Sequence, residues 1–126
     1  MRQEAIVLVA DRNPRIRGFL ERELRGAGYQ VHAVDSVSQL INWIGREELP
    51  DLLVLDPDLP GGSPEDHIWP MLARHPRLPV VFHCLSADIP TPFPRMSCTV
   101  IVEKSADSID LLKRQIALLL NRNHLD

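Results

Sequence analysis

The feature that most constrains this chain of 126 residues is the segment Asp51–Gly61, with the sequence DLLVLDPDLPG. A short apolar run stops at the carboxylate of Asp56 and passes into a turn rich in proline. A continuous apolar run that ends in such a turn is typical of a parallel strand buried on both faces. In an open α/β sheet, ligands bind beyond the carboxyl ends of the strands. We therefore expect Asp56 to lie where the chain carries out its function.

Apolar periodicity and capping signals predict strands that alternate with helices along the whole chain. The predicted strands are Glu4–Ala10, Tyr29–Val34, Leu52–Asp56, Pro79–Cys84 and Thr99–Glu103. Helices are predicted at Pro14–Ala27, after Ser36, after Ser63 and at Ser108–Asn121. This alternation predicts one α/β domain over residues 1–126, a flavodoxin-like, doubly wound (βα)₅ three-layer sandwich. Its parallel sheet would have the strand order 2-1-3-4-5.

Prolines predict irregularity in two of the connecting segments. Pro70 would kink or delay the helix that follows Ser63, because proline lacks a backbone N–H and clashes with the preceding turn. Between the fourth and fifth predicted strands, Pro90, Pro92 and Pro94 alternate with other residues. Such a pattern cannot support a regular helix, so the fourth helix is expected to be irregular.

Composition excludes several classes of function. The formal net charge of -3 gives no general attraction to nucleic acid or to an anionic membrane. No apolar run has the length of a membrane span, and no signal peptide is recognisable. Cys84 and Cys98 do not make a disulfide framework, and the scattered histidines have no zinc-ligand spacing. These observations predict a cytoplasmic protein that binds no nucleic acid directly.

The predicted strand ends bring charged side chains to one place. Asp11 follows the first strand, Asp56 ends the third and Lys104 follows the fifth. Because the first and third strands flank the point where the strand order reverses, two carboxylates and an ammonium would share one crevice. Carboxylate and carbonyl oxygens suit Mg²⁺, and an aspartate can act as a nucleophile toward a phosphoryl group.

Three segments carry a resemblance to a known family. They are Ile6–Asp11 with the helix behind it, Asp51–Gly61, and Val100–Lys104 before the last helix. The chain resembles the receiver domains of two-component response regulators over nearly its whole length. The middle segment is the most specific of the three, because it combines a buried strand, an aspartate and Leu-Pro-Gly at fixed spacing.

The resemblance implies a phosphorelay function and a set of site residues. Asp56 would accept a phosphoryl group from the phosphohistidine of a histidine kinase or phosphotransfer protein. Asp11, Asp56 and the backbone carbonyl of Asp58 would hold Mg²⁺, and Lys104 would contact the phosphoryl oxygens. The chain would not be an enzyme beyond its own aspartate phosphorylation and dephosphorylation. It would signal through a downstream protein partner, and the family also allows a homodimer.

The chain departs from the family pattern at several positions. The family usually has two adjacent acidic residues after the first strand, and Ala10 is taken to replace the first of them, so the affinity for Mg²⁺ should fall. Cys84 stands where the family has a threonine or serine at the end of the fourth strand, unless a bulge brings Ser86 there. Ile101 stands at an aromatic position, and Ser105 stands where proline usually follows the lysine.

Two alternatives to this function remain open. The departures at Ala10 and Cys84, with the proline-rich segment, favour a pseudo-receiver that binds a partner protein without phosphate chemistry. A small-ligand binder or enzyme of the same architecture is the other alternative. A nucleotide or flavin site is disfavoured because Asp11–Pro14 stands where a glycine-rich phosphate loop would follow the first strand.

Overall fold

The computed structural model describes residues 4–46, 49–85 and 99–125, with side chains described up to residue 121. The strands are β1 (Ile6–Ala10), β2 (Gln30–Val34), β3 (Leu52–Leu55), β4 (Val80–Cys84) and β5 (Thr99–Glu103). The helices are α1 (Pro14–Gly26), α2 (Val37–Ile44), the π-helical turn η1 (Pro64–Ile68), α3 (Trp69–Ala73) and α4 (Ser108–Leu125). The predicted order of these elements is confirmed. Most boundaries differ by one or two residues, and α4 runs four residues beyond its predicted end at Asn121.

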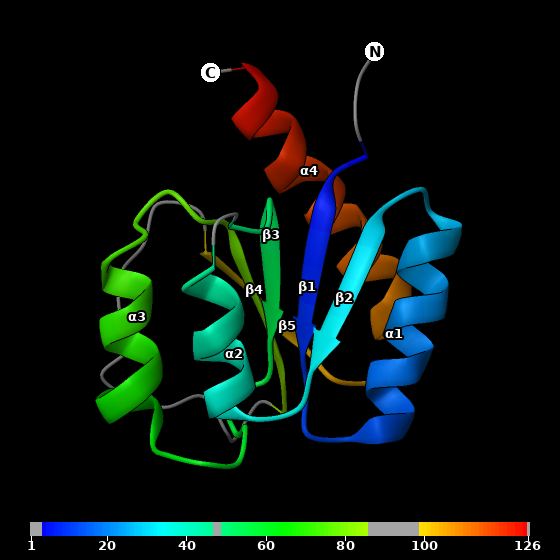
Figure 1. Cartoon of the computed structure of the whole chain (residues 1–126). Helices are drawn as coiled ribbons and strands as arrows, with labels where there is room; N and C mark the ends of the chain where they lie inside the picture. Colours follow the sequence, from blue (N-terminus) through cyan, green and yellow to red (C-terminus); the bar gives the residue numbers. More distant parts are fainter. Residues whose placement is uncertain (1–3, 47–48, 86–98, 126) are drawn as a thin grey trace.

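The described strands form one parallel sheet in the order β2-β1-β3-β4-β5, as predicted. Ala10 pairs with Leu55 at the end of β1 and β3, and Cys84 pairs with Glu103 at the end of β4 and β5. Since every strand runs in the same direction, their carboxyl ends lie together at the lower edge of the sheet in Figure 1. The residues that follow these ends therefore meet at this edge.

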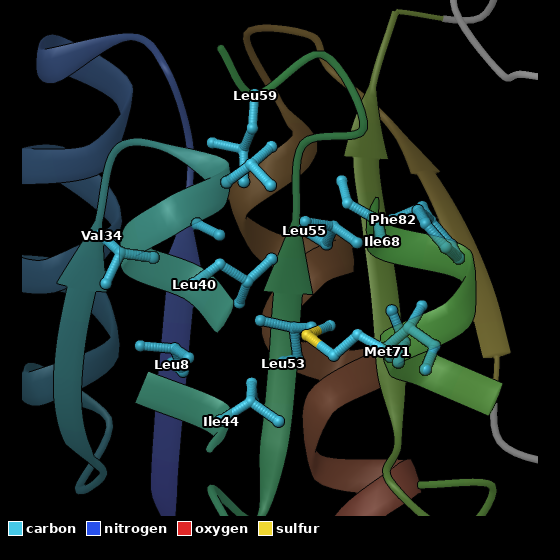
Figure 2. Packing of buried hydrophobic residues seen from close by; sticks show 14 of the residues in the cluster. Leu8, Val34, Leu40, Ile44, Leu53, Leu55, Leu59, Ile68, Met71 and Phe82 are labelled. Atoms are coloured by element: carbon cyan, nitrogen blue, oxygen red, sulfur yellow. The ribbon is translucent and has the colours of Figure 1, made fainter. Parts of the chain in front are cut away.

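Helices cover both faces of the sheet and make three layers. Helices α2 and α3 lie on one face, and α1 and α4 lie on the other (Figure 1). The strands alternate between the two cores, because successive side chains point to opposite faces. Leu8 and Leu53 pack toward α2 and α3 (Figure 2), whereas Val7 and Val9 join the core toward α1 and α4. This alternation decides which residues at the strand ends can reach the site.

Helix α1 begins directly beside the edge of the sheet. The Asn13 side-chain oxygen accepts hydrogen bonds from the backbone N–H groups of Arg15 and Ile16, at 2.9 and 3.3 Å. Pro14 occupies the first helical position, where its missing N–H costs no hydrogen bond. The predicted cap is confirmed, and it fixes how the chain leaves β1.

The helix after β3 carries the irregularity predicted from Pro70. It opens as the wide turn η1, in which the Trp69 N–H bonds to the carbonyl of Pro64, five residues back. It then continues as the short helix α3. Pro70 has no N–H to donate, so the regular ladder cannot pass through it. Trp69 packs against the core, where its ring meets Phe82 edge to face with the centroids 5.8 Å apart.

Some predictions fall on residues that the structure does not describe. The proline-rich segment with Pro90, Pro92 and Pro94, together with Ser86 and Cys98, lies outside the described residues. Within the described ranges, no helix has the length and apolar character needed to cross a membrane.

Candidate functional site

Three charged side chains predicted from the sequence meet at the carboxyl edge of the sheet. The ammonium Nζ of Lys104 lies 3.2 Å from Oδ2 of Asp11 and 3.3 Å from Oδ2 of Asp56. Both carboxylates are almost fully buried, and the Lys104 side chain is 12% exposed. Little water therefore screens these contacts, and the ammonium bridges two carboxylates that would otherwise repel each other.

Backbone N–H groups orient both carboxylates. Oδ1 of Asp11 accepts a hydrogen bond from the Asn13 N–H at 2.8 Å, and Oδ1 of Asp56 accepts one from the Asp58 N–H at 3.0 Å. Each bond spans two residues and closes a turn directly after a strand. Because Oδ1 is held by the turn in both cases, Oδ2 faces the ammonium of Lys104.

A cation that the sequence analysis did not single out also enters the site. Nε of Arg12 lies 3.6 Å from Oδ2 of Asp56, and a terminal nitrogen of the same guanidinium lies 3.8 Å from Oδ2 of Asp58. The Arg12 side chain is half exposed. Its place directly after Asp11, at the end of the first predicted strand, was a usable signal in the sequence.

The expectation about Ala10 is corrected by the structure. Its side chain is buried in the core toward α2 and α3, on the same face as Leu8. An acidic side chain at position 10 would therefore enter that apolar core and not the site. The adjacent residues whose side chains reach the site after β1 are Asp11 and Arg12. The residue that changes the charge of a metal site here is thus Arg12.

An open pocket of about 340 Å³ lies over the buried carboxylates. Its lining includes Arg12, Asn13, Asp56, Lys104 and Ser105. Asp56 therefore combines burial with access from one side. A small anion that enters this pocket would meet both cations together with the carboxylate.

Burial changes the protonation of Asp11. It raises the pKa of this carboxyl above the usual value of 3.8, and the negative charge of Asp56 acts in the same direction. The Asn13 N–H and the ammonium of Lys104 lower the pKa and oppose these effects. The raised pKa means that burial disfavours the ionised form of Asp11, and the ammonium of Lys104 offsets part of this effect.

A buried histidine supports the segment that carries Lys104. His83 lies on β4, and its Nε2 is 3.1 Å from Oγ of Ser108 in the first turn of α4. The Ser108 hydroxyl donates to the carbonyl of Ser105 at 3.0 Å. The Lys104 N–H also bonds to the carbonyl of Cys84 at 2.8 Å. These contacts hold the connection between β5 and α4 against the end of β4. The sequence analysis assigned no role to His83.

The remaining candidate residues lie partly in the core, partly at the surface and partly in the pocket lining. Cys84 is 1% exposed and belongs to the apolar core toward α2 and α3. The described pocket lining does not include it. Ile101 is exposed on β5, and Ser105 lines the pocket. Asp58 contributes a half-exposed carboxylate, and its backbone N–H orients Asp56.

The described residues do not fit a Mg²⁺ site. A hard divalent cation needs several oxygen ligands that carry negative charge. The buried carboxylates of Asp11 and Asp56 already contact Lys104, and Arg12 reaches Asp56 and Asp58. Among the described residues, no three His, Cys, Asp or Glu side chains are grouped so that they could hold a metal ion.

Comparison with known proteins agrees with the observed fold. Residues 7–115 match the family model of the response regulator receiver domain. The chain belongs to this family. The receiver domain is 31% identical to the DNA-binding transcriptional regulator NtrC of Escherichia coli (strain K12) over 87 residues. This alignment covers 69% of the present chain but 18% of NtrC.

Solved receiver structures have the same fold. The signal receiver domain of a putative LuxO repressor protein from Vibrio parahaemolyticus superposes with a TM-score of 0.81 and 23% identity, over 98% of this chain and 95% of that one. TrrA from Thermotoga maritima, solved with Mg²⁺ and BeF, gives a TM-score of 0.75 and 21% identity, over 91% and 98% of the two chains. At this level of identity, these likenesses show the fold alone.

Proposed function

We propose that residues 1–126 form one receiver domain in which Asp56 accepts a phosphoryl group from the phosphohistidine of a histidine kinase or phosphotransfer protein. The observation that carries this proposal is the surroundings of Asp56. It follows β3, is almost fully buried, and lies beneath an open pocket with Lys104 3.3 Å and Arg12 3.6 Å from Oδ2. A buried carboxylate with one open side and two cations suits attack on an anionic phosphoryl group.

The proposed phosphoryl transfer needs no reactant other than the phosphohistidine donor and solvent. The Asp56 carboxylate attacks phosphorus from the side opposite the imidazole of the donor, and a P–O bond forms as the P–N bond breaks. The electron pair returns to the imidazole nitrogen, which takes up a proton from solvent. Lys104 and Arg12 offset the negative charge on the phosphoryl oxygens, because both face the same pocket.

The proposed partners follow from relatives in the family. TrrA has been solved in complex with the histidine kinase ThkA, and the matched chain of that complex is 24% identical to this chain. NtrC is a DNA-binding transcriptional regulator, and the chain matches less than a fifth of its length. In the proposed pathway, a histidine kinase donates the phosphoryl group and a downstream protein receives the signal. The receiver domain can also pair with a second copy of itself, and we place it in the cytoplasm.

Intact mass measurement tests the acceptor directly. The protein is incubated with acetyl phosphate and weighed, alongside Asp56→Ala and the control Asp58→Asn. We expect a phosphoryl increment in the wild type and in Asp58→Asn, and none in Asp56→Ala. An increment that persists in Asp56→Ala would contradict the assignment of the acceptor.

A second candidate is favoured by a specific observation. The positive charge of Arg12 beside Asp56 and Asp58 already balances part of the site, so the domain could bind its partner without phosphorylation. This pseudo-receiver function predicts a folded protein that gains no mass from acetyl phosphate or from phosphohistidine donors. It also predicts that partner binding is the same in the wild type and in Asp56→Ala.

A further inference from the structure

The loop that carries Arg12 is held in place by contacts on both sides. Asp11 is fixed by the Asn13 N–H, and the side chain of Arg17 donates to the backbone carbonyl of Asp11 at 2.8 Å. The cap of α1 then begins at Asn13. These contacts fix the backbone on either side of Arg12, so its side chain starts from a defined point at the edge of the pocket.

From this point, the guanidinium lies between two carboxylates of the β3 turn. Its Nε is 3.6 Å from Asp56, and a terminal nitrogen is 3.8 Å from Asp58. These separations are long for ion pairs, and the side chain is half exposed, so the bonds themselves contribute little to stability. The location of the charge is what matters, because the guanidinium places its positive charge beside both carboxylates.

The charges around Asp56 leave little attraction for a divalent cation. Asp11 and Asp56 share Lys104, and Asp56 shares Arg12 with Asp58. A metal ion bound to Asp56 from the open side would lie within a few ångströms of the guanidinium. Repulsion between a unit charge and a divalent ion at such a distance is large, even with partial screening by water.

We propose that Arg12 takes the place of a divalent metal ion in this receiver domain. It keeps Mg²⁺ away from Asp56 and itself supplies positive charge next to the carboxylate. The planar guanidinium can donate several hydrogen bonds to phosphoryl oxygens, which a metal would otherwise coordinate. The exclusion of the metal stands on the geometry alone, whereas the contact with a phosphoryl group rests on the proposed function.

Calorimetric titration with MgCl₂ tests the exclusion of the metal without any phosphorylation. We expect no saturable heat for the wild type at millimolar Mg²⁺. Arg12→Asp exchanges the cation for a third carboxylate beside Asp11 and Asp56, and it should bind Mg²⁺ at least about tenfold more tightly than the wild type. Arg15→Asp makes the same change of charge at an exposed position outside the described pocket lining, and it should behave as the wild type.

A second arm measures the phosphoryl increment with acetyl phosphate in EDTA and in MgCl₂. The proposal expects the same increment in both for the wild type, and dependence on Mg²⁺ for Arg12→Asp. Saturable Mg²⁺ binding by the wild type that is lost in Asp56→Asn would overturn the exclusion. A phosphoryl increment that requires Mg²⁺ in the wild type would overturn the replacement.

The two arms separate this inference from the proposed function. If no increment forms under any condition, phosphorylation at Asp56 is contradicted, while the titration still decides whether Arg12 excludes the metal. Gain of Mg²⁺ binding by Arg12→Asp and not by Arg15→Asp supports the inference in that case as well. Equal binding by both variants would contradict it, because a general change of net charge would then explain the result.

Discussion

The imidazole Nε2 of His83 lies 3.1 Å from Oγ of Ser108, across the connection that carries Lys104. When the Ser108 hydroxyl donates to the carbonyl of Ser105, Nε2 of His83 carries the ring proton and donates it to Oγ of Ser108. Nδ1 is then unprotonated, and it has no hydrogen-bond partner among the described residues. Protonation of this ring would place a buried charge close to the ammonium of Lys104.

We predict that His83 makes the fold sensitive to mild acid. Burial, together with the charge of Lys104, lowers the pKa of His83 from 6.5 to about 4 in the folded state. Between these values the unfolded state binds more protons, so the free energy of unfolding falls as the pH falls from about 6.5 to about 4. The full effect is about 3 kcal/mol.

Urea unfolding across this range of pH, for the wild type and His83→Gln, measures the effect. The variant cannot titrate and should lose this part of the slope, whatever its stability at pH 7. Asp11 has a raised pKa and contributes a slope of opposite sign, but it is present in both proteins and cancels in the difference. Parallel curves for the two proteins would show that His83 is not the titrating group.

Lys104 is predicted to stabilise the fold as well as the site. In Lys104→Met, the buried carboxylates of Asp11 and Asp56 lose the ammonium that bridges them. Removal of one partner from a buried ionic group leaves an uncompensated charge, and we expect a loss of about 3 kcal/mol at neutral pH. Chemical denaturation gives this value directly.

Lys113→Met is the matched control for this substitution. Lys113 pairs with Glu23 at 2.9 Å, but both side chains are partly exposed, so the loss should stay below about 1 kcal/mol. In an Asp56→Asn background, the cost of Lys104→Met should shrink, since one of the stranded charges is gone. Strict additivity of the two substitutions would argue that Lys104 and Asp56 are not coupled.

Gly61 shapes the turn that follows Asp56, and we predict that Gly61→Ala destabilises the protein. Its φ angle is 107°, a conformation that strains any residue with a Cβ atom. The expected loss is about 1–2 kcal/mol, measured by thermal unfolding. Gly18→Ala provides the opposite case, since Gly18 lies within α1 and a Cβ there meets no atom within 4 Å. That variant should gain about 0.5–1 kcal/mol, and equal effects at both positions would contradict the argument.

Much of the site could be predicted because parallel topology decides where strand ends meet. Asp11, Asp56 and Lys104 each follow a strand, and the order of the strands brings them together without any knowledge of side-chain contacts. The turn after Asp56 and the cap at Asn13 are local features with strong residue preferences. Local and topological signals agree at these positions, which explains why the interpretation from the sequence holds there.

Other features depend on contacts that have no local signal. His83 and Ser108 are 25 residues apart, and neither fits a motif. The direction of Ala10 depends on the alternation along β1, and a strand that is apolar on both faces hides which face each residue takes. The half-exposed Arg12 is placed by the turn after β1 and not by its own sequence pattern.

The position of Ala10 leads to a final prediction that separates the two explanations of the metal site. If an acidic residue at position 10 belonged to the site, Ala10→Asp would restore Mg²⁺ binding. Its side chain instead points into the core toward α2 and α3, where an unpaired carboxylate costs several kcal/mol. We expect Ala10→Asp to lower the free energy of unfolding by about 3 kcal/mol or more at pH 7, without a gain in Mg²⁺ affinity. The loss should become smaller in acid, where the carboxyl is protonated, whereas the isosteric Ala10→Asn should show no such dependence on pH. A stable Ala10→Asp protein that binds Mg²⁺ would place residue 10 in the site and remove Arg12 from its proposed role.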